Sequence, residues 1–115
     1  NLLTGNKAEN LFELDYWGLS NKQAFEYILK KDRSGLIKIG SASSISLRNS
    51  KAILEYKNRE RILITKNQDA DYIIDNYINW YKYKKKRHKI PNDFEIYKEI
   101  KVNGNKILSI YKNNN

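Results

Sequence analysis

Apolar residues recur with helical spacing early in the chain and in short strand-like runs later, which predicts a domain built from helices and strands. The first helix starts at Ser20, which forms a capping-box pattern with Gln23 three residues later, and continues to about Lys31. Gly35 stands where the chain turns after this helix. Four apolar side chains share one helix face and are candidates for the core: Ala24, Phe25, Ile28 and Leu29.

Five later segments have the apolar, β-rich composition of strands. Between the first two, residues 47–57 show the weaker pattern of a second helix. The third strand segment lacks helix breakers, so a helix there stays open as an alternative. The strand segments are residues 36–40, 61–65, 71–77, 94–102 and 106–111.

The last two strand segments predict an antiparallel hairpin. They are joined across Asn103 and Gly104, two residues that tolerate the positive φ of a tight turn. Ile96, Ile100 and Val102 share one face of the first arm, and Lys98 interrupts the alternation.

This order of elements predicts a small α/β sandwich with a mixed sheet. Strands separated by helices favour a partly parallel βαβ core, to which the C-terminal hairpin adds antiparallel strands. Residues 1–10 lack periodicity and are expected to lead in from a preceding segment. Residues 11–111 are expected to form the single domain, and residues 112–115 a frayed tail.

Length and composition exclude several classes of protein. At 115 residues the chain supports one hydrophobic core, and its apolar runs are far shorter than the ~20 residues of a membrane helix. The absence of cysteine excludes disulfides and thiolate metal sites. One histidine, His88, leaves little material for a histidine metal site or a Ser-His-Asp triad. Because the chain starts at Asn1 and has no methionine, we expect a fragment or a processed product.

The net charge of +9 is concentrated in one short run, and without the six cations of that run it falls to +3. Together with Trp80 and Tyr81, the run suits phosphate contact and base stacking in a nucleic-acid-binding module. It also suits anionic lipid headgroups, and a solvated loop before Pro91 is the third interpretation. The cations are Lys82, Lys84, Lys85, Lys86, Arg87 and Lys89.

A run of small residues after the first strand is a candidate anion site. Ser41, Ser43 and Ser44 follow Gly40 and precede the predicted second helix. Small residues allow backbone N–H groups to converge on an anion near a helix start. The segment lacks the phosphate-loop lysine and the glycine pattern of dinucleotide sites, and an ordinary strand-to-helix loop is the alternative.

Two carboxylates, Asp69 and Asp71, have the spacing of the Asp-x-Asp metal clamp of some nucleotide-sugar transferases. Such a pair can hold a divalent ion that neutralises a diphosphate. Aspartates are also common in turns for purely structural reasons. We therefore expect no metal site, and the sequence indicates no cofactor.

The most distinctive segment combines aromatic and acidic residues in Phe12-Glu13-Leu14-Asp15-Tyr16-Trp17-Gly18. Aromatic rings beside carboxylates stack on sugars and accept hydroxyl hydrogen bonds. Alternatively, the rings anchor the first helix to the sheet and Asp15 satisfies backbone donors. The candidate contact or anchor residues are Glu13, Asp15, Tyr16 and Trp17.

The same segment, continued by Leu19 and Ser20, resembles bacterial GT-C-type membrane glycosyltransferases, of the kind similar to protein O-mannosyltransferases and aminoarabinose transferases. In that family an acid–Asp-Tyr-Trp-Gly segment follows the last membrane span. Ala70-Asp71-Tyr72-Ile73-Ile74 resembles the family's Ala-Asp-Tyr strand, and the C-terminal hairpin resembles its last two strands. The basic run at residues 82–89 is not part of this pattern.

The resemblance implies a C-terminal, extracytoplasmic domain of a membrane enzyme that uses a polyprenyl-phosphate sugar donor. It implies that the catalytic carboxylates lie in the membrane portion, so no catalytic residue is assigned here. The expected partners are the membrane-embedded catalytic domain of the same polypeptide and a polyprenyl-phosphate-linked sugar or anionic lipid headgroups. Nucleic acid is the partner under the alternative interpretation of the basic run.

Overall fold

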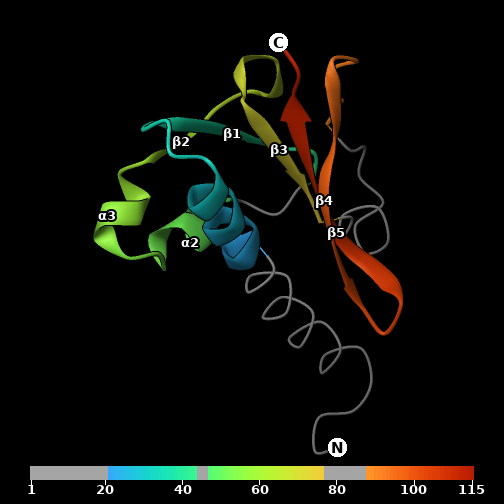
Figure 1. The fold of residues 1–115 in the computed structure, drawn as a ribbon, viewed down its shortest axis with the longest axis horizontal. Helices are drawn as coiled ribbons and strands as arrows, with labels where there is room; N and C mark the ends of the chain where they lie inside the picture. The colour runs from blue at the N-terminus through green and yellow to red at the C-terminus, as the bar shows by residue number, and fades with distance from the viewer. Residues whose placement is uncertain (1–20, 44–46, 77–87) are drawn as a thin grey trace, which may run out of the picture.

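A computed structural model describes residues 21–43, 47–76 and 88–115 (Figure 1). Residues 21–31 are helical, which agrees with the predicted first helix over the part described. The capping residue Ser20 lies outside the described residues, as does the lead-in at 1–10. The remaining elements are β1 (Ile37–Ser41), α2 (Leu47–Ala52), α3 (Tyr56–Arg59), β2 (Ile62–Ile64), η1 (Asn67–Asp69), β3 (Tyr72–Asp75), β4 (Phe94–Val102) and β5 (Asn105–Asn113).

The strands form a single five-stranded mixed sheet in the order β2-β1-β3-β5-β4. β1 pairs in parallel with both β2 and β3, and the β4–β5 hairpin adds two antiparallel strands beside β3. The predicted mixed α/β fold is therefore confirmed. The segment at 71–77 contains a strand rather than a helix, and Figure 1 shows α2 and α3 at the opposite end of the sheet from the hairpin.

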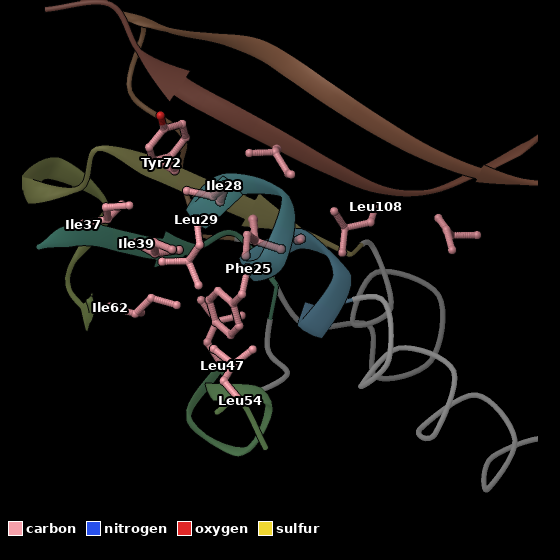
Figure 2. Packing of buried hydrophobic residues seen from close by; sticks show 14 residues of the cluster. Phe25, Ile28, Leu29, Ile37, Ile39, Leu47, Leu54, Ile62, Tyr72 and Leu108 are labelled. Atoms are coloured by element: carbon pink, nitrogen blue, oxygen red, sulfur yellow. The ribbon is translucent and has the colours of Figure 1, made fainter. Parts of the chain in front are cut away.

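One face of the sheet packs against the helices and forms the main core. Phe25 and Ile28 are fully buried against the strands. Figure 2 shows the Phe25 side chain directed toward Leu47 and Leu54, while the Tyr72 hydroxyl points out of the cluster. Alternate strand residues supply the rest of the core: Ile37, Ile39, Ile62, Tyr72, Ile74, Leu108 and Ile110.

The second face carries a smaller apolar cluster. Ile73 of β3 and Phe94 of β4 pack there against Ala42, which directly follows β1, and Ala70, with Ile90 and Tyr111 half-buried around them. Because Ile73 faces away from the helices while its neighbours Tyr72 and Ile74 face toward them, all three side chains are buried. Both faces of β3 are thus covered, as expected of a central strand whose first three residues are apolar.

Arg61 joins the end of the first helix to the sheet. Its guanidinium donates hydrogen bonds to the carbonyl oxygens of Leu29, Asp32 and Gly35. The Leu29 and Asp32 carbonyls lie at the end of the helix, where carbonyls lack intrahelical partners, and the Gly35 carbonyl lies in the turn that follows. The predicted turn at Gly35 is confirmed, since this residue has a φ of 101°.

The second helix differs from the prediction for residues 47–57. It divides into α2 and α3, because Glu55 adopts an extended backbone (φ −59°, ψ 149°) between them. The division turns Leu54 into the core, where it is only 4% exposed. Burial of one leucine therefore outweighs the continuation of a weakly amphipathic helix.

The hairpin has its predicted turn and an unpredicted irregularity. Asn103 (φ 52°) and Gly104 (φ 79°) both have the positive φ of a two-residue hairpin turn. The pairing shifts between Ile96 and Lys98, where the sequence alternation is interrupted. As a consequence Tyr97 packs on the main core while Ile96 is 55% exposed, so the shared face predicted for Ile96 and Ile100 is wrong. The side chain of Val102 lies outside what the structure describes.

β5 extends two residues beyond the predicted end at Tyr111. Lys112 pairs with Tyr72 of β3, and Asn113 pairs with Phe94 of β4. The Asn113 side chain also donates to the Ala70 carbonyl oxygen, at 3.2 Å. The first half of the segment expected to be a frayed tail is therefore part of the sheet.

In residues 21–43, 47–76 and 88–115, no helix has the length and apolarity that crossing a bilayer requires.

Candidate anion-binding site at the end of β1

A hollow of about 520 Å³ opens where β1 and β2 end and α2 begins. Residues from four separate segments meet around it, and most of their side chains are polar. They are Ser41, Ser43, Leu47, Arg48, Ile64, Thr65, Lys66, Asn67, Gln68, His88 and Lys89.

The register of the sheet explains why these segments converge. Ile39 of β1 pairs with Ile64 of β2 on one side and with Tyr72 of β3 on the other. Residues 65–71 must therefore cross β1 from one neighbour to the other. The crossing segment is fixed to β1 at both ends, since the Thr65 amide donates to the Ile39 carbonyl oxygen and the Asp71 amide to the Lys38 carbonyl oxygen (3.0 and 2.8 Å).

Gly40 allows this segment to lie directly on β1. A Cβ atom at Gly40 would overlap Asn67 Oδ1 and would lie 3.2 Å from the Asn67 Cα. A side chain at this position would push the crossing segment outward. The glycine that precedes the small-residue run is therefore required for close backbone approach, a role distinct from phosphate binding.

Asn67 holds the wall of the hollow together. Its side-chain Nδ2 donates to the carbonyl oxygens of Ser41, at 3.1 Å, and Lys89, at 3.0 Å. The next residue back, His88, donates its amide to the Ala42 carbonyl oxygen. One side chain thus connects the end of β1, the crossing segment and the segment that leads to β4.

The charge around the hollow is positive. Arg48, Lys66 and Lys89 line it, and none of its described lining residues is acidic, which gives a formal charge of +3 with His88 neutral. Because α2 has only six residues, we attribute the attraction for anions to these side chains rather than to a helix N-terminus. Cations around a partly enclosed space favour a compact anion such as a phosphate.

Three hydroxyl groups complete the site. The Ser43 amide donates to Ser41 Oγ, and Ser41 Oγ lies 3.0 Å from the Ser43 carbonyl oxygen, so these two residues form a compact turn. Thr65 Oγ1 is buried and has no hydrogen-bond partner among the described residues. A buried hydroxyl without a partner is costly, and Thr65 is one of the residues that line the hollow.

Some of the residues predicted to bind anions line the hollow, and the others lie outside the described residues. Ser41 and Ser43 both line the hollow, and Ser44 lies outside the described residues. Of the basic run, Lys89 lines the hollow, while Lys82, Lys84, Lys85, Lys86 and Arg87 lie outside the described residues. Their binding roles stay predictions.

The aromatic-acidic candidates Glu13, Asp15, Tyr16 and Trp17 lie outside the described residues. Both aspartates of the Asp-x-Asp pattern lie within the described residues, and Asp71 has a structural role, since its carboxylate accepts a hydrogen bond from the Lys38 amide at 2.9 Å. No cluster of three or more histidine or acidic side chains close enough to hold a metal ion occurs in the described part of the chain.

Sequence reasoning missed Arg48, Thr65, Lys66 and Asn67. Lys66 and Asn67 directly follow the predicted strand at 61–65, and this position at a strand end was the one sequence feature that could have indicated them as site residues. Without the register, nothing in the sequence places that strand end beside Ser41.

No protein family, curated protein or solved structure matches this chain.

Proposed function

We propose that this chain is an accessory domain of a membrane glycosyltransferase, on the extracytoplasmic side, that binds a phosphate group in the hollow at the end of β1. The observation that supports phosphate binding is the convergence of Arg48, Lys66 and Lys89 around a hollow whose described lining residues include no acidic side chain. The assignment to a glycosyltransferase rests on the resemblance of residues 12–20 and 70–74.

The hollow suits a phosphate with part of its carrier. Its volume lies within the roughly 300–1,000 Å³ that is typical of small-molecule sites. Arginine and lysine neutralise the charge, and the Ser43 hydroxyl is placed at the same opening to donate to a phosphate oxygen. Leu47 and Ile64 add apolar surface at the same opening. A phosphate attached to a lipid therefore fits the chemistry, and its source is either the polyprenyl-phosphate donor or an anionic lipid headgroup.

In this role the hollow binds a phosphate group and carries out no chemical step. None of its described lining residues is a carboxylate that can act as a general base or nucleophile in sugar transfer. The catalytic carboxylates that the resemblance implies belong to the membrane portion. The domain would hold the phosphate-bearing end of a lipid near that portion.

The phosphate source is tested with two soluble probes, farnesyl phosphate and dihexanoyl-phosphatidylglycerol. Binding of each to the chain is measured by calorimetry, with Lys66→Glu as the site variant and Lys101→Glu as the matched charge control on the distant hairpin. Tighter binding of farnesyl phosphate, weakened only by Lys66→Glu, supports the polyprenyl-phosphate donor. Equal or tighter binding of the phospholipid points to headgroups. Absence of binding to both contradicts the proposal.

The parent enzyme is tested by an immunoblot of separated membrane and soluble fractions of native cells. We expect a membrane band several times heavier than the 13.6 kDa of this chain. A soluble band near 13.6 kDa would contradict the assignment to a membrane glycosyltransferase. Oligonucleotide binding through Trp80, Tyr81 and the basic run would then be the next test.

A further inference from the structure

A second depression lies beside the hollow, between α2 and the edge strand β2. It has a volume of about 410 Å³, and it shares Arg48 and Ile64 with the hollow. We call it the edge groove, and its six lining residues are Arg48, Lys51, Ala52, Arg59, Leu63 and Ile64.

The edge groove has an apolar floor. Ala52, Leu63 and Ile64 supply its apolar surface, and Leu63 is 44% exposed although it lies in a strand. Two further large apolar residues are exposed nearby in the chain, Ile53 in the turn after α2 at 56% and Tyr56 of α3 at 66%. Exposed aliphatic side chains gathered at a charged rim are typical of an interaction surface.

The rim of the edge groove is cationic. Arg48, Lys51 and Arg59 surround the floor, and none of the described residues that line it is acidic. Arg59 is held in place, because its Nη1 donates to the Ala52 carbonyl oxygen at 3.1 Å and its guanidinium lies 5.7 Å from the centre of the Tyr56 ring. Over residues 47–66 the chain has six basic and two acidic side chains, a net charge of +4.

This pattern selects among the possible occupants. A second copy of the chain would bring two cationic rims together, which charge repulsion disfavours. Single-stranded nucleic acid needs aromatic platforms for its bases, whereas none of the described residues that line the groove is aromatic, and the nearby Tyr56 ring already has the Arg59 guanidinium 5.7 Å from its centre. An anionic bilayer meets both requirements, since lysine and arginine bind its phosphates while short apolar side chains enter the interface.

We infer that the edge groove and its rim dock this domain onto the surface of a bilayer that contains anionic phospholipids. This contact goes beyond the proposed function, because it depends on Lys51, Arg59 and Leu63 and not on a phosphate inside the hollow. It would orient the domain with the β2 edge toward the membrane and the β4–β5 hairpin away from it.

The experiment measures co-sedimentation of the chain with vesicles of phosphatidylcholine alone and of phosphatidylcholine mixed with an equal part of phosphatidylglycerol. We expect binding to the mixed vesicles only, with an affinity that falls as salt is added. Lys51→Glu should weaken this binding about 30-fold, because it reverses one charge near the membrane surface. Leu63→Ser should weaken it about fivefold by removing a half-exposed apolar side chain.

Three outcomes would overturn the inference. The first is equal sedimentation with both vesicle types, and the second is unchanged binding of Lys51→Glu relative to the control Lys101→Glu. The third is displacement by an oligonucleotide with no effect of Leu63→Ser, which would indicate a nucleic-acid surface. Circular dichroism confirms that each variant is folded, and Lys51→Gln provides a milder substitution.

The vesicle result is separable from phosphate binding in the hollow. Leu63→Ser leaves the hollow intact, so titration with inorganic phosphate should be unchanged in this variant. Vesicle binding without phosphate binding contradicts the proposed function alone. If soluble phosphate displaces the chain from vesicles more strongly than sodium chloride of equal ionic strength does, the headgroup occupies the hollow, and docking through the edge groove is wrong.

Discussion

Gly40→Ala is the substitution that most directly tests how the hollow is built. The added Cβ would overlap Asn67 Oδ1 and would crowd the Asn67 backbone at 3.2 Å. Rotating the Asn67 side chain away breaks its hydrogen bonds to the Ser41 and Lys89 carbonyl oxygens. Two lost hydrogen bonds cost about 1–3 kcal/mol, and the residual backbone overlap adds about 1 kcal/mol.

We therefore expect Gly40→Ala to lower the free energy of unfolding by about 3 kcal/mol, as measured by urea unfolding. A double-mutant cycle with Asn67→Ala isolates the cause. Asn67→Ala alone should cost about 2 kcal/mol, and Gly40→Ala in that background should cost only about 1 kcal/mol. The two substitutions should thus be non-additive by about 2 kcal/mol.

Gly35→Ala is the control for this cycle. A Cβ at Gly35 meets no atom within 4 Å, so the cost comes from the φ of 101° and amounts to about 1 kcal/mol. This cost should be the same with and without Asn67. Additive effects of Gly40→Ala and Asn67→Ala, or a neutral Gly40→Ala, would refute the explanation of how the crossing segment is held.

Three further predictions concern stability. Arg61→Lys should lower the free energy of unfolding, measured in urea, by about 2 kcal/mol, because a lysine cannot hydrogen-bond to all three carbonyl oxygens with the geometry of a guanidinium. An unchanged free energy of unfolding would contradict the role of Arg61 at the helix end. Burial and the hydrogen bond to Asp32 raise the pKa of Tyr72 above its ordinary value of 10.0. The free energy of unfolding of the wild type should therefore fall as the pH rises above about 10, and Tyr72→Phe should make this fall smaller. Gly104→Ala should cost about 1 kcal/mol at a φ of 79°, and retention of full thermal stability would contradict the turn assignment.

At acidic pH the dependence of stability on pH has the opposite sign, and Asp32 is the residue responsible: the free energy of unfolding should fall as the pH is lowered, which we call the acid limb. A hydrogen bond from Ser34 is the largest cause that lowers the pKa of Asp32 below its ordinary value of 3.8. The charged carboxylate therefore contributes stability that is present above pH 3.8 and is lost as the pH falls below it. Asp32→Asn should flatten this acid limb in urea unfolding as a function of pH. A limb as steep as that of the wild type would contradict the role of Asp32.

The elements of the fold were predictable where local pattern and burial agree. The helix ending near Lys31, the hairpin turn at Asn103 and Gly104, and the strand character of residues 72–75 all follow from periodicity or turn chemistry. The break at Glu55 did not, because it depends on the burial of Leu54 against residues distant in the sequence. The displaced pairing beside Tyr97 likewise depends on which aromatic side chain the core accepts.

The candidate site was half predictable. The small residues after the first strand indicated Ser41 and Ser43, because a strand-to-helix loop is a common place for anions. Thr65 and Lys66 belong to the site only because the crossing segment returns over β1, which is a consequence of sheet order and register. Gly40 illustrates the difference, since the sequence leaves it in either an anion-binding loop or an ordinary strand-to-helix loop, and the structure shows a close backbone crossing there.

Binding of phosphate in the hollow is tested most directly by titrating the ¹⁵N-labelled chain with inorganic phosphate and following its amide signals. We predict saturable shifts confined to the end of β1 and the crossing segment, at Ser41, Ser43, Thr65 and Lys66. Lys66→Glu should weaken the affinity tenfold or more, at about 1.5–3 kcal/mol for a charged hydrogen bond, while Lys101→Glu should leave it unchanged. Shifts that do not saturate, that spread over the basic surface, or that persist in Lys66→Glu would contradict the account.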